Sequence, residues 1–174
     1  QVSITTTEGA ATTIRSVGTA RRYTVHGIPG EEFPALPQLD DQSQLLSLDV
    51  ETLSQLISAT QFSVSTDETR LHLNSALFEW EGDRVRMVST DGHRLSMITR
   101  SVESVTEAVE GVILPRKGIA EVAKILESGE GDVTLVLEEG MAHALRGNVE
   151  LSMRLVEGEF PDYRQVVPQK SDLK

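Results

Sequence analysis

The sequence has 174 residues, of which 39% are hydrophobic and 25% are charged, and its formal net charge is −11 at pH 7. This composition is typical of a soluble globular protein with a packed core, and no apolar run approaches the roughly 20 residues that span a membrane, which excludes a disordered or membrane-embedded chain. The absence of cysteine excludes disulfides and thiol chemistry and fits a cytoplasmic protein, while the acidic balance opposes simple nucleic-acid binding, which depends on Lys and Arg.

Three short strands are predicted at the beginning of the chain, because Thr and β-branched residues are frequent there and Gly-containing turns separate them. Their ranges are 2–7, 11–17 and 20–26. The next segment, 27–37, contains three prolines within nine positions, which excludes a regular helix or a central strand. We therefore expect a linker after the third strand.

A first helix is predicted after a short strand at 45–48, with Asp49 as its N-cap and apolar residues at helical spacing as far as about Ala59. The stretch that follows is predicted to consist of strands, with the turn-forming sequence Glu81-Gly82-Asp83 between two of them. These strands are 62–64, 71–80, 85–89, 94–99 and 112–114.

A second helix is expected to begin after Pro115 and to end before Gly129. Its apolar stripe consists of Ile119, Val122, Ala123 and Leu126. Three further strands are predicted at 133–137, 142–146 and 150–156.

The stretch Thr90–Leu95 places a turn, an imidazole and a guanidinium between two strand-like runs. Its Asp91-Gly92 pair predicts a hairpin turn with positive backbone φ. One alternative is that His93 and Asp91 are a catalytic base and its orienter, as in a hydrolase, and another is that they bind a metal. The hydrolase would need a nucleophile, and the sequence places none beside the pair. The metal site would need more ligands, and the other histidines have no metal-like spacing.

The chain also contains an apparent internal repeat. Val133-Thr134-Leu135 aligns with Val2-Ser3-Ile4 at an offset of 133 − 2 = 131 residues, and this offset places Leu145-Arg146 on Ile14-Arg15. The sequence Glu159-Phe160-Pro161 aligns with Glu32-Phe33-Pro34 at 160 − 33 = 127. A chance match of two short β-meanders is the alternative, but the shared order of these features favours a repeat of roughly 120 to 130 residues.

Three separated motifs carry a resemblance to a known family. They are Ser89–Leu95, Leu114–Gly118 at the start of the second helix, and Glu159–Arg164 near the end. In this order they resemble the bacterial DNA polymerase III beta subunit family, the sliding clamps. The resemblance implies an α+β clamp fold, in which each of several repeated domains packs two helices on antiparallel β-sheets.

The resemblance also implies how the chain divides. Residues 1–37 would be the C-terminal part of a first clamp domain, 38–168 a complete middle domain, and 169–174 the start of a linker to a third domain that this sequence lacks. The chain would then be a fragment of a longer protein, since its first residues have the pattern of the middle of a strand.

The function implied by the resemblance is that of a processivity factor without catalytic residues or cofactors. Clamps of this family form head-to-tail homodimeric rings that encircle double-stranded DNA and tether the DNA polymerase III alpha subunit, the clamp loader and repair proteins. Enclosure holds the DNA without strong phosphate binding, which agrees with an acidic chain.

Eight positions match the partner-peptide groove of the family. They are Leu73, Thr90, Gly92, His93, Arg94, Leu95, Pro161 and Val166. The second helix offers three DNA-facing candidates, Arg116, Lys117 and Lys124. Without the resemblance, the first set would be interpreted as core or strand-end residues and the second as a solvated helix face. Phe78 and Trp80 are expected to be packing residues, because glutamates flank the tryptophan and a base-stacking site needs positive charge.

Overall fold

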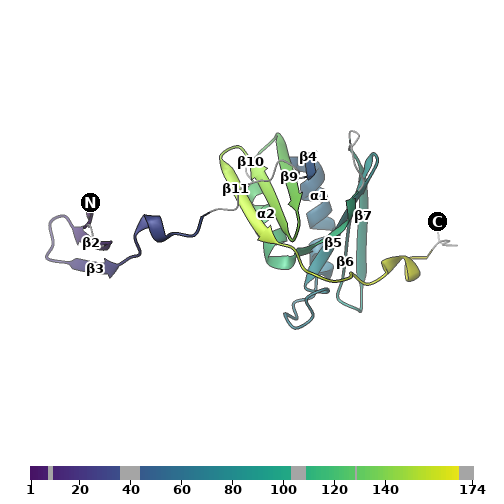
Figure 1. Cartoon of the computed structure of the whole chain (residues 1–174), viewed down its shortest axis with the longest axis horizontal. Coiled ribbons are helices and arrows are strands. Elements are labelled where there is room, and N and C mark those ends of the chain that lie inside the picture. Colours follow the sequence, from purple (N-terminus) through teal and green to yellow (C-terminus); the bar gives the residue numbers. More distant parts are fainter. Residues whose placement is uncertain (8–9, 36–43, 103–108, 128, 169–174) are drawn as a thin grey trace. The chain divides into compact units, whose positions relative to one another are not determined.

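The computed structural model describes residues 1–7, 10–35, 44–102, 109–127 and 129–168. The chain divides into two compact units, Gln1–Gln38 and Leu39–Lys174, which we call the N-terminal and the C-terminal unit. The first contains strands and a short helical turn, and the second contains two four-stranded sheets and the helices α1 (Val50–Thr60) and α2 (Arg116–Leu126) (Figure 1).

The N-terminal unit is a three-stranded antiparallel meander followed by a 3₁₀-helix at Gly30–Glu32. Its strands are β1 (Val2–Thr6), β2 (Ala11–Ser16) and β3 (Arg22–His26). The three predicted strands are therefore confirmed to within two residues. The expected linker is also free of long regular elements as far as residue 35, where the described part of this unit ends.

One face of this meander is apolar. Ile4 pairs with Ile14, and Ile14 pairs with Tyr23, so the three side chains share a face with Val2 and Val25. Much of this face is uncovered, since Ile4 is 68% exposed and Tyr23 is 64% exposed. Alternation thus defines an apolar face that the described residues of this unit do not bury.

The C-terminal unit contains two four-stranded antiparallel sheets, ordered β11-β10-β9-β4 and β7-β6-β5-β8. The strands of the first sheet are β4 (Gln44–Asp49), β9 (Asp132–Glu138), β10 (Met141–Arg146) and β11 (Val149–Arg154). Those of the second are β5 (Ser75–Glu81), β6 (Arg84–Thr90), β7 (Leu95–Ser101) and β8 (Val109–Pro115).

The two α-helices begin where the sequence predicts. In α1 (Val50–Thr60), the Asp49 side chain accepts a hydrogen bond from the Thr52 N–H at 2.7 Å, which confirms the predicted N-cap. Pro115 precedes α2 (Arg116–Leu126), and its fixed φ suits the entry to a helix. Gly118 lets α2 approach β11 closely, since a Cβ there would lie 2.5 Å from the Met153 sulfur.

The main core lies between the helices and the two sheets, and Figure 1 shows the sheets on either side of α1. Each helix contributes its apolar stripe to this core, where it meets the inward-facing residues of both sheets. Phe78 and Trp80 are almost fully buried and form an edge-on ring pair with centroids 5.7 Å apart, so their expected packing role is confirmed.

Two predicted strand segments are wrong. The segment 62–64 is largely a 3₁₀-helix, Gln61–Ser63, which continues α1, and the Val64 N–H bonds to the Gln61 carbonyl. Residues 71–74 form turns rather than the start of β5, because the Leu73 and Asn74 N–H groups bond to the Arg70 carbonyl. Both segments satisfy their backbone donors locally and so do not extend a sheet.

The two meanders that the sequence alignment matched have the same strand order, but the alignment slips at a hairpin. Ile4 pairs with Ile14, whereas its counterpart Leu135 pairs with Ala144. The offset is therefore 135 − 4 = 131 in one strand and 144 − 14 = 130 in the next. Placing Leu145-Arg146 on Ile14-Arg15 was wrong by one residue, because the second hairpin is shorter.

Candidate functional site

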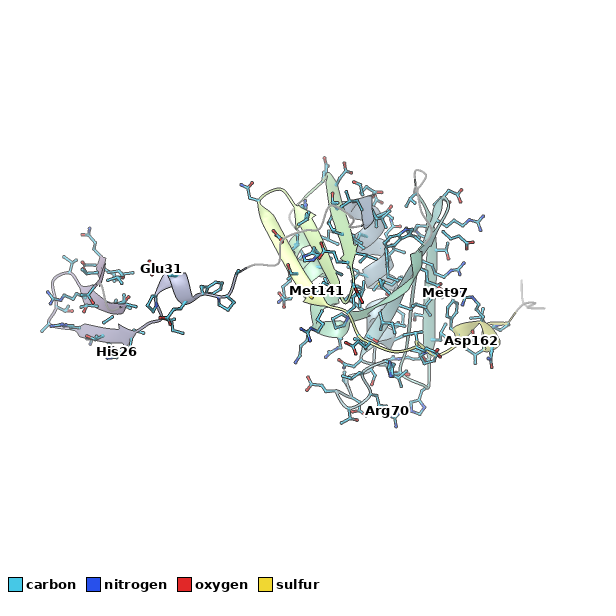
Figure 2. All side chains as sticks on the ribbon, viewed as in Figure 1. His26, Glu31, Arg70, Met97, Met141 and Asp162 are labelled. Atoms are coloured by element: carbon cyan, nitrogen blue, oxygen red, sulfur yellow. The ribbon has the colours of Figure 1, made fainter. Side chains whose placement is uncertain are left out.

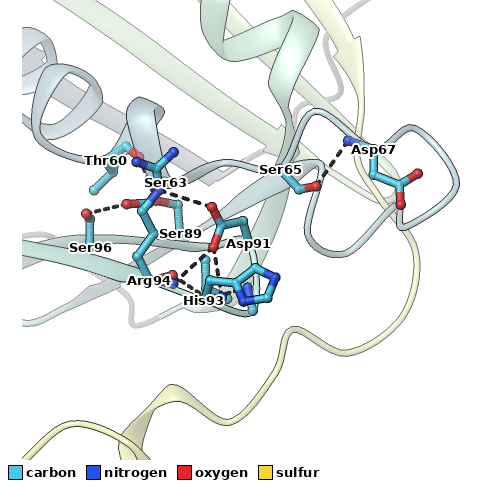
Figure 3. Close-up of polar contacts among 11 residues, drawn as sticks. Thr60, Ser63, Ser65, Asp67, Ser89, Asp91, His93, Arg94 and Ser96 are labelled. Carbon is cyan, nitrogen blue, oxygen red and sulfur yellow. Dashed lines mark hydrogen bonds and ion pairs between the residues drawn. The ribbon is translucent and has the colours of Figure 1, made fainter.

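The loop Asp91–Arg94 joins β6 to β7, whose last paired residues are Thr90 and Leu95. Gly92 has a φ of +91°, which confirms the predicted positive φ. The Asp91 carboxylate shapes the rest of the loop, since its Oδ1 accepts from the His93 N–H at 2.9 Å and the Arg94 N–H at 3.0 Å. The loop between the paired residues Thr90 and Leu95 thus has four residues, and Figure 3 shows Asp91 bonded to His93 and Arg94 within it.

Asp91 is fully engaged by this loop. Its Oδ2 accepts from the Arg94 Nε at 3.0 Å, and the backbone N–H groups of His93 and Arg94 lower the pKa of the carboxyl below its ordinary value. The His93 backbone, and not its imidazole, is the donor to Asp91. This geometry does not form the base and orienter of the hydrolase alternative.

Four hydroxyl groups fix the same hairpin. The Thr90 Oγ1 donates to the Arg94 carbonyl at 2.7 Å and accepts from the Gly92 N–H at 3.1 Å. The Ser89 hydroxyl donates to the Thr60 carbonyl at 2.6 Å at the end of α1, and the Ser63 and Ser96 hydroxyls are hydrogen-bonded at 2.6 Å. The hairpin is therefore anchored to the rigid core through α1, as Figure 3 shows.

A closing strap, residues 155–167, follows β11 and passes from the first sheet to the second. The Leu155 N–H bonds to the Gly140 carbonyl and the Val156 N–H to the Ile113 carbonyl, each at 2.9 Å. The strap ends in a 3₁₀-helix, Tyr163–Gln165, which Asp162 caps through its side chain (Figure 2). Tyr163 is 4% exposed and belongs to a small apolar cluster on the face of the second sheet opposite the main core.

The hairpin and the strap are the two walls of one surface pocket with a volume of about 570 Å³. All eight residues predicted for the groove line it, together with Asp162 and Tyr163. These two additional residues lie between Pro161 and Val166 in the sequence, within a motif that already pointed to this segment. Leu73 reaches the pocket from the turn that precedes β5.

The pocket is apolar with a polar rim. Leu73, Leu95, Pro161 and Val166 supply apolar surface, and Val166 is 68% exposed, so its side chain is available to a ligand. His93 and Arg94 are exposed beside them and offer donors for carbonyl or carboxylate oxygens. This size and chemistry suit a short peptide with apolar side chains.

The DNA-facing candidates lie elsewhere, on the exposed surface of α2, and do not reach the pocket. The Lys117 Nζ lies 3.2 Å from a Glu68 carboxylate oxygen, and the Lys124 Nζ lies 2.6 Å from one of Glu121. Both lysines are therefore paired with carboxylates of the chain itself, which weakens the positive field of this helix.

Among the described residues, no three His, Asp or Glu side chains gather in a way that could hold a metal ion. Within those residues, too, neither helix has the length and apolar character needed to cross a membrane.

Comparison with known proteins decides the family. Residues 47–162 match the model of the DNA polymerase III beta subunit, central domain. The chain belongs to the DNA polymerase III beta subunit family. A protein named beta sliding clamp from Salmonella typhimurium is 37% identical over 153 residues, a match that covers 87% of this chain and 41% of the relative. The chain thus spans about two fifths of the length of the curated relatives that it matches.

Solved structures agree with this assignment. The DNA polymerase III subunit beta from Pseudomonas aeruginosa has a TM-score of 0.83 and 32% sequence identity, covering 98% of this chain and 46% of that one. The DNA polymerase sliding clamp from Bacillus subtilis has a TM-score of 0.82 and 29% identity, covering 98% and 44%. The α+β clamp fold is therefore confirmed, and the hydrolase alternative has no support among these proteins.

Proposed function

We propose that this chain is part of a DNA sliding clamp, a processivity factor that tethers replication and repair proteins through the pocket between hairpin and strap. The observation that carries the proposal is that eight residues, predicted from three separate stretches of sequence, line one exposed apolar pocket. The pocket volume of about 570 Å³ falls in the range of ligand sites. In this role the chain has no catalytic residue of its own and needs no cofactor.

The domain division is part of the proposal. Residues 1–37 are the end of a first clamp domain, residues 38–168 are the middle domain, and residues 169–174 lead toward a third. The shared strand order of β1–β3 and β9–β11 supports this division, as does the family match to residues 47–162. The uncovered apolar face of β1–β3 is also expected of a sheet whose covering helices belong to an earlier part of a domain.

The partners follow from the same assignment. In a protein of its relatives' length, head-to-tail pairing of two chains forms a cytoplasmic ring around double-stranded DNA. The pocket then receives peptides of the DNA polymerase III alpha subunit and the clamp loader. Arg116, Lys117 and Lys124 face the DNA, and the carboxylates beside two of them keep this contact weak enough for sliding.

A peptide titration tests the pocket. The chain is titrated with a fluorescein-labelled peptide that carries a clamp-binding motif, while the methyl signals of Leu73, Leu95 and Val166 are followed by NMR. We expect these signals to shift. We expect Val166→Ala to weaken binding about fivefold, because the peptide loses part of one apolar wall.

A matched control is Val149→Ala, which removes the same atoms from a valine 50% exposed on β11. It should leave the affinity unchanged. Two results would count against the groove. One is that the peptide binds but the methyl signals of the pocket do not shift, and the other is that both variants lose the same peptide affinity.

A further inference from the structure

The polar end of the strap contains a cluster that peptide binding does not explain. The Tyr163 hydroxyl donates to the Glu79 carboxylate at 2.7 Å and accepts from the Arg86 guanidinium at 2.9 Å. Arg164 donates to the other Glu79 oxygen at 2.9 Å, and its guanidinium carbon lies 4.8 Å from the centre of the Tyr163 ring. Glu79 is therefore held by Tyr163 and Arg164 of the strap, and the Arg86 guanidinium of its own sheet forms an ion pair with it at 3.6 Å.

These groups lie at one edge of the apolar patch under the strap. Glu79 pairs with Arg86 across β5 and β6, on the same face as Leu77 and Val88, which pack against Tyr163. The Glu79 side chain is 19% exposed, so its bonds to the strap are partly shielded from water. Burial is the main cause that raises the pKa of Tyr163, and the hydroxyl stays protonated as a donor.

Other contacts also hold the strap, since Phe160 and Val167 pack against the same apolar cluster as Tyr163. Val156 begins it with a hydrogen bond to Ile113. Gly158 then passes under His72, since a Cβ there would lie 2.6 Å from the His72 Cε1. Pro161 and Val166, which line the pocket, flank Tyr163, so the place where Tyr163 is fixed sets where this wall stands.

The internal repeat provides a comparison. At the offset of 127 that aligns the two Glu-Phe-Pro sequences, Tyr163 corresponds to residue 163 − 127 = 36 and Arg164 to residue 164 − 127 = 37. These positions are Leu36 and Pro37, neither of which can make such bonds. The two strap residues of the cluster are therefore not repeated in the first Glu-Phe-Pro segment.

We propose that Glu79, Arg86, Tyr163 and Arg164 form a latch that fixes the strap on the second sheet and thereby positions the strap wall of the peptide pocket. This inference rests on the proposed function, and it assigns to these side chains a positioning role, although Tyr163 also lines the pocket. The latch holds Pro161 and Val166 in place before a peptide arrives, so binding does not have to order them.

The test is Tyr163→Phe, which keeps the buried ring and removes the hydroxyl. Hydrogen exchange is measured on the whole 174-residue chain, and affinity is measured with the fluorescein-labelled clamp-motif peptide. We expect the Val166 and Val167 amides, which bond to the Tyr163 carbonyl, to exchange about tenfold faster, and the peptide to bind about fivefold more weakly. The amides of β6 should keep their protection.

The matched control is Thr99→Val. The Thr99 hydroxyl accepts a hydrogen bond from the Arg86 Nε at 3.1 Å, so this variant removes a bond to the same guanidinium without touching the strap. Strap exchange and peptide affinity should stay at their wild-type values. Glu79→Gln combined with Tyr163→Phe should cost less than the sum of the two single effects, because both variants lose the hydrogen bond between Glu79 and Tyr163.

Several results would overturn the latch. One is that the strap amides of Tyr163→Phe exchange at the wild-type rate. Another is that the effects of the two single changes add up in the double variant. A third is a uniform loss of protection over strap and sheet with peptide affinity intact, which assigns the cluster to stability alone. If the wild-type chain bound no peptide, the proposed function would fail, and strap exchange would still decide whether the latch exists.

Discussion

The meanders β1–β3 and β9–β11 have the same strand order and similar apolar alternation, yet their apolar faces differ in burial. Ile4 on β1 is 68% exposed, whereas its counterpart Leu135 on β9 is 7% exposed. Across the hairpin, Ala144 is fully buried. Alternation in the sequence thus determines which face of a meander is apolar, and the elements that pack on that face determine whether it becomes core.

The cover of the second meander comes from the helices. Leu53 and Leu56 of α1 and Ile119 and Val122 of α2 belong to the same core as Leu135. In the described part of the N-terminal unit, residues 1–7 and 10–35, the only helical element is the 3₁₀-helix Gly30–Glu32. The same strand pattern therefore contributes to stability in one place and leaves apolar surface exposed in the other.

The largest expected difference in the free energy of unfolding is between alanine variants of the counterparts Leu135 and Ile4. Leu135→Ala should lower the free energy of unfolding of the C-terminal unit by about 3 kcal/mol, because it leaves a cavity in the main core. Ile4→Ala should change it by less than about 0.5 kcal/mol, as expected for an exposed side chain. Urea unfolding followed by the fluorescence of Trp80, the single tryptophan and a core residue, measures this unit alone.

A loss in Ile4→Ala as large as that in Leu135→Ala would contradict the comparison, because an exposed side chain outside the C-terminal unit should not stabilise that unit. A conservative check is Leu135→Met, which keeps the volume and should cost less than about 1.5 kcal/mol.

The fold could be predicted from the sequence where local chemistry specifies it. Asp49 before an apolar helical pattern predicted the start of α1, and Gly92 predicted a positive φ, because each depends on a few neighbouring residues. Segments 62–64 and 71–74 could not be predicted in this way, since a short apolar run suits a strand and a turn equally well. The one-residue slip between the meanders depended on hairpin length, which composition does not determine.

The site was predictable only in part. The eight pocket residues came from the family resemblance, because the sequence alone does not show that the hairpin and the strap meet. The closing motif contains Tyr163, but nothing local links Tyr163 to Glu79, since the two residues are 84 positions apart. Contacts of this kind become visible only when the chain is folded.

A smaller effect is expected at the N-cap of α1. This helix covers β9–β11, and the described part of the N-terminal unit has no corresponding α-helix. Asp49→Ala should cost about 1 kcal/mol in the same unfolding experiment, because the Thr52 N–H loses its acceptor. The hydrogen bond from Thr52 lowers the pKa of Asp49 below its ordinary value of 3.8. The cap contribution is therefore complete above that value and is lost as the pH falls through the lower pKa of the folded state.

The matched control for the cap is Asp83→Ala, in a turn where the aspartate is 70% exposed and only 3.8 Å from Arg84. It should cost a few tenths of a kcal/mol at most, since an exposed ion pair contributes little. The difference between the two variants should shrink in acid. A difference that stays constant from neutral to strongly acidic pH would contradict the capping role of the Asp49 carboxylate.

The smallest effect is expected when the N-terminal unit is removed. The side chains of both apolar clusters lie between Leu46 and Val167, so residues 39–174 contain the whole of each cluster as described. Deletion of residues 1–38 should therefore change the free energy of unfolding reported by Trp80 by less than about 0.5 kcal/mol. It should also remove binding of a hydrophobic dye such as ANS to the exposed face that includes Ile4 and Tyr23. A loss above about 1 kcal/mol would show that β1–β3 does stabilise the C-terminal unit, and the contrast between the two meanders would then be one of degree.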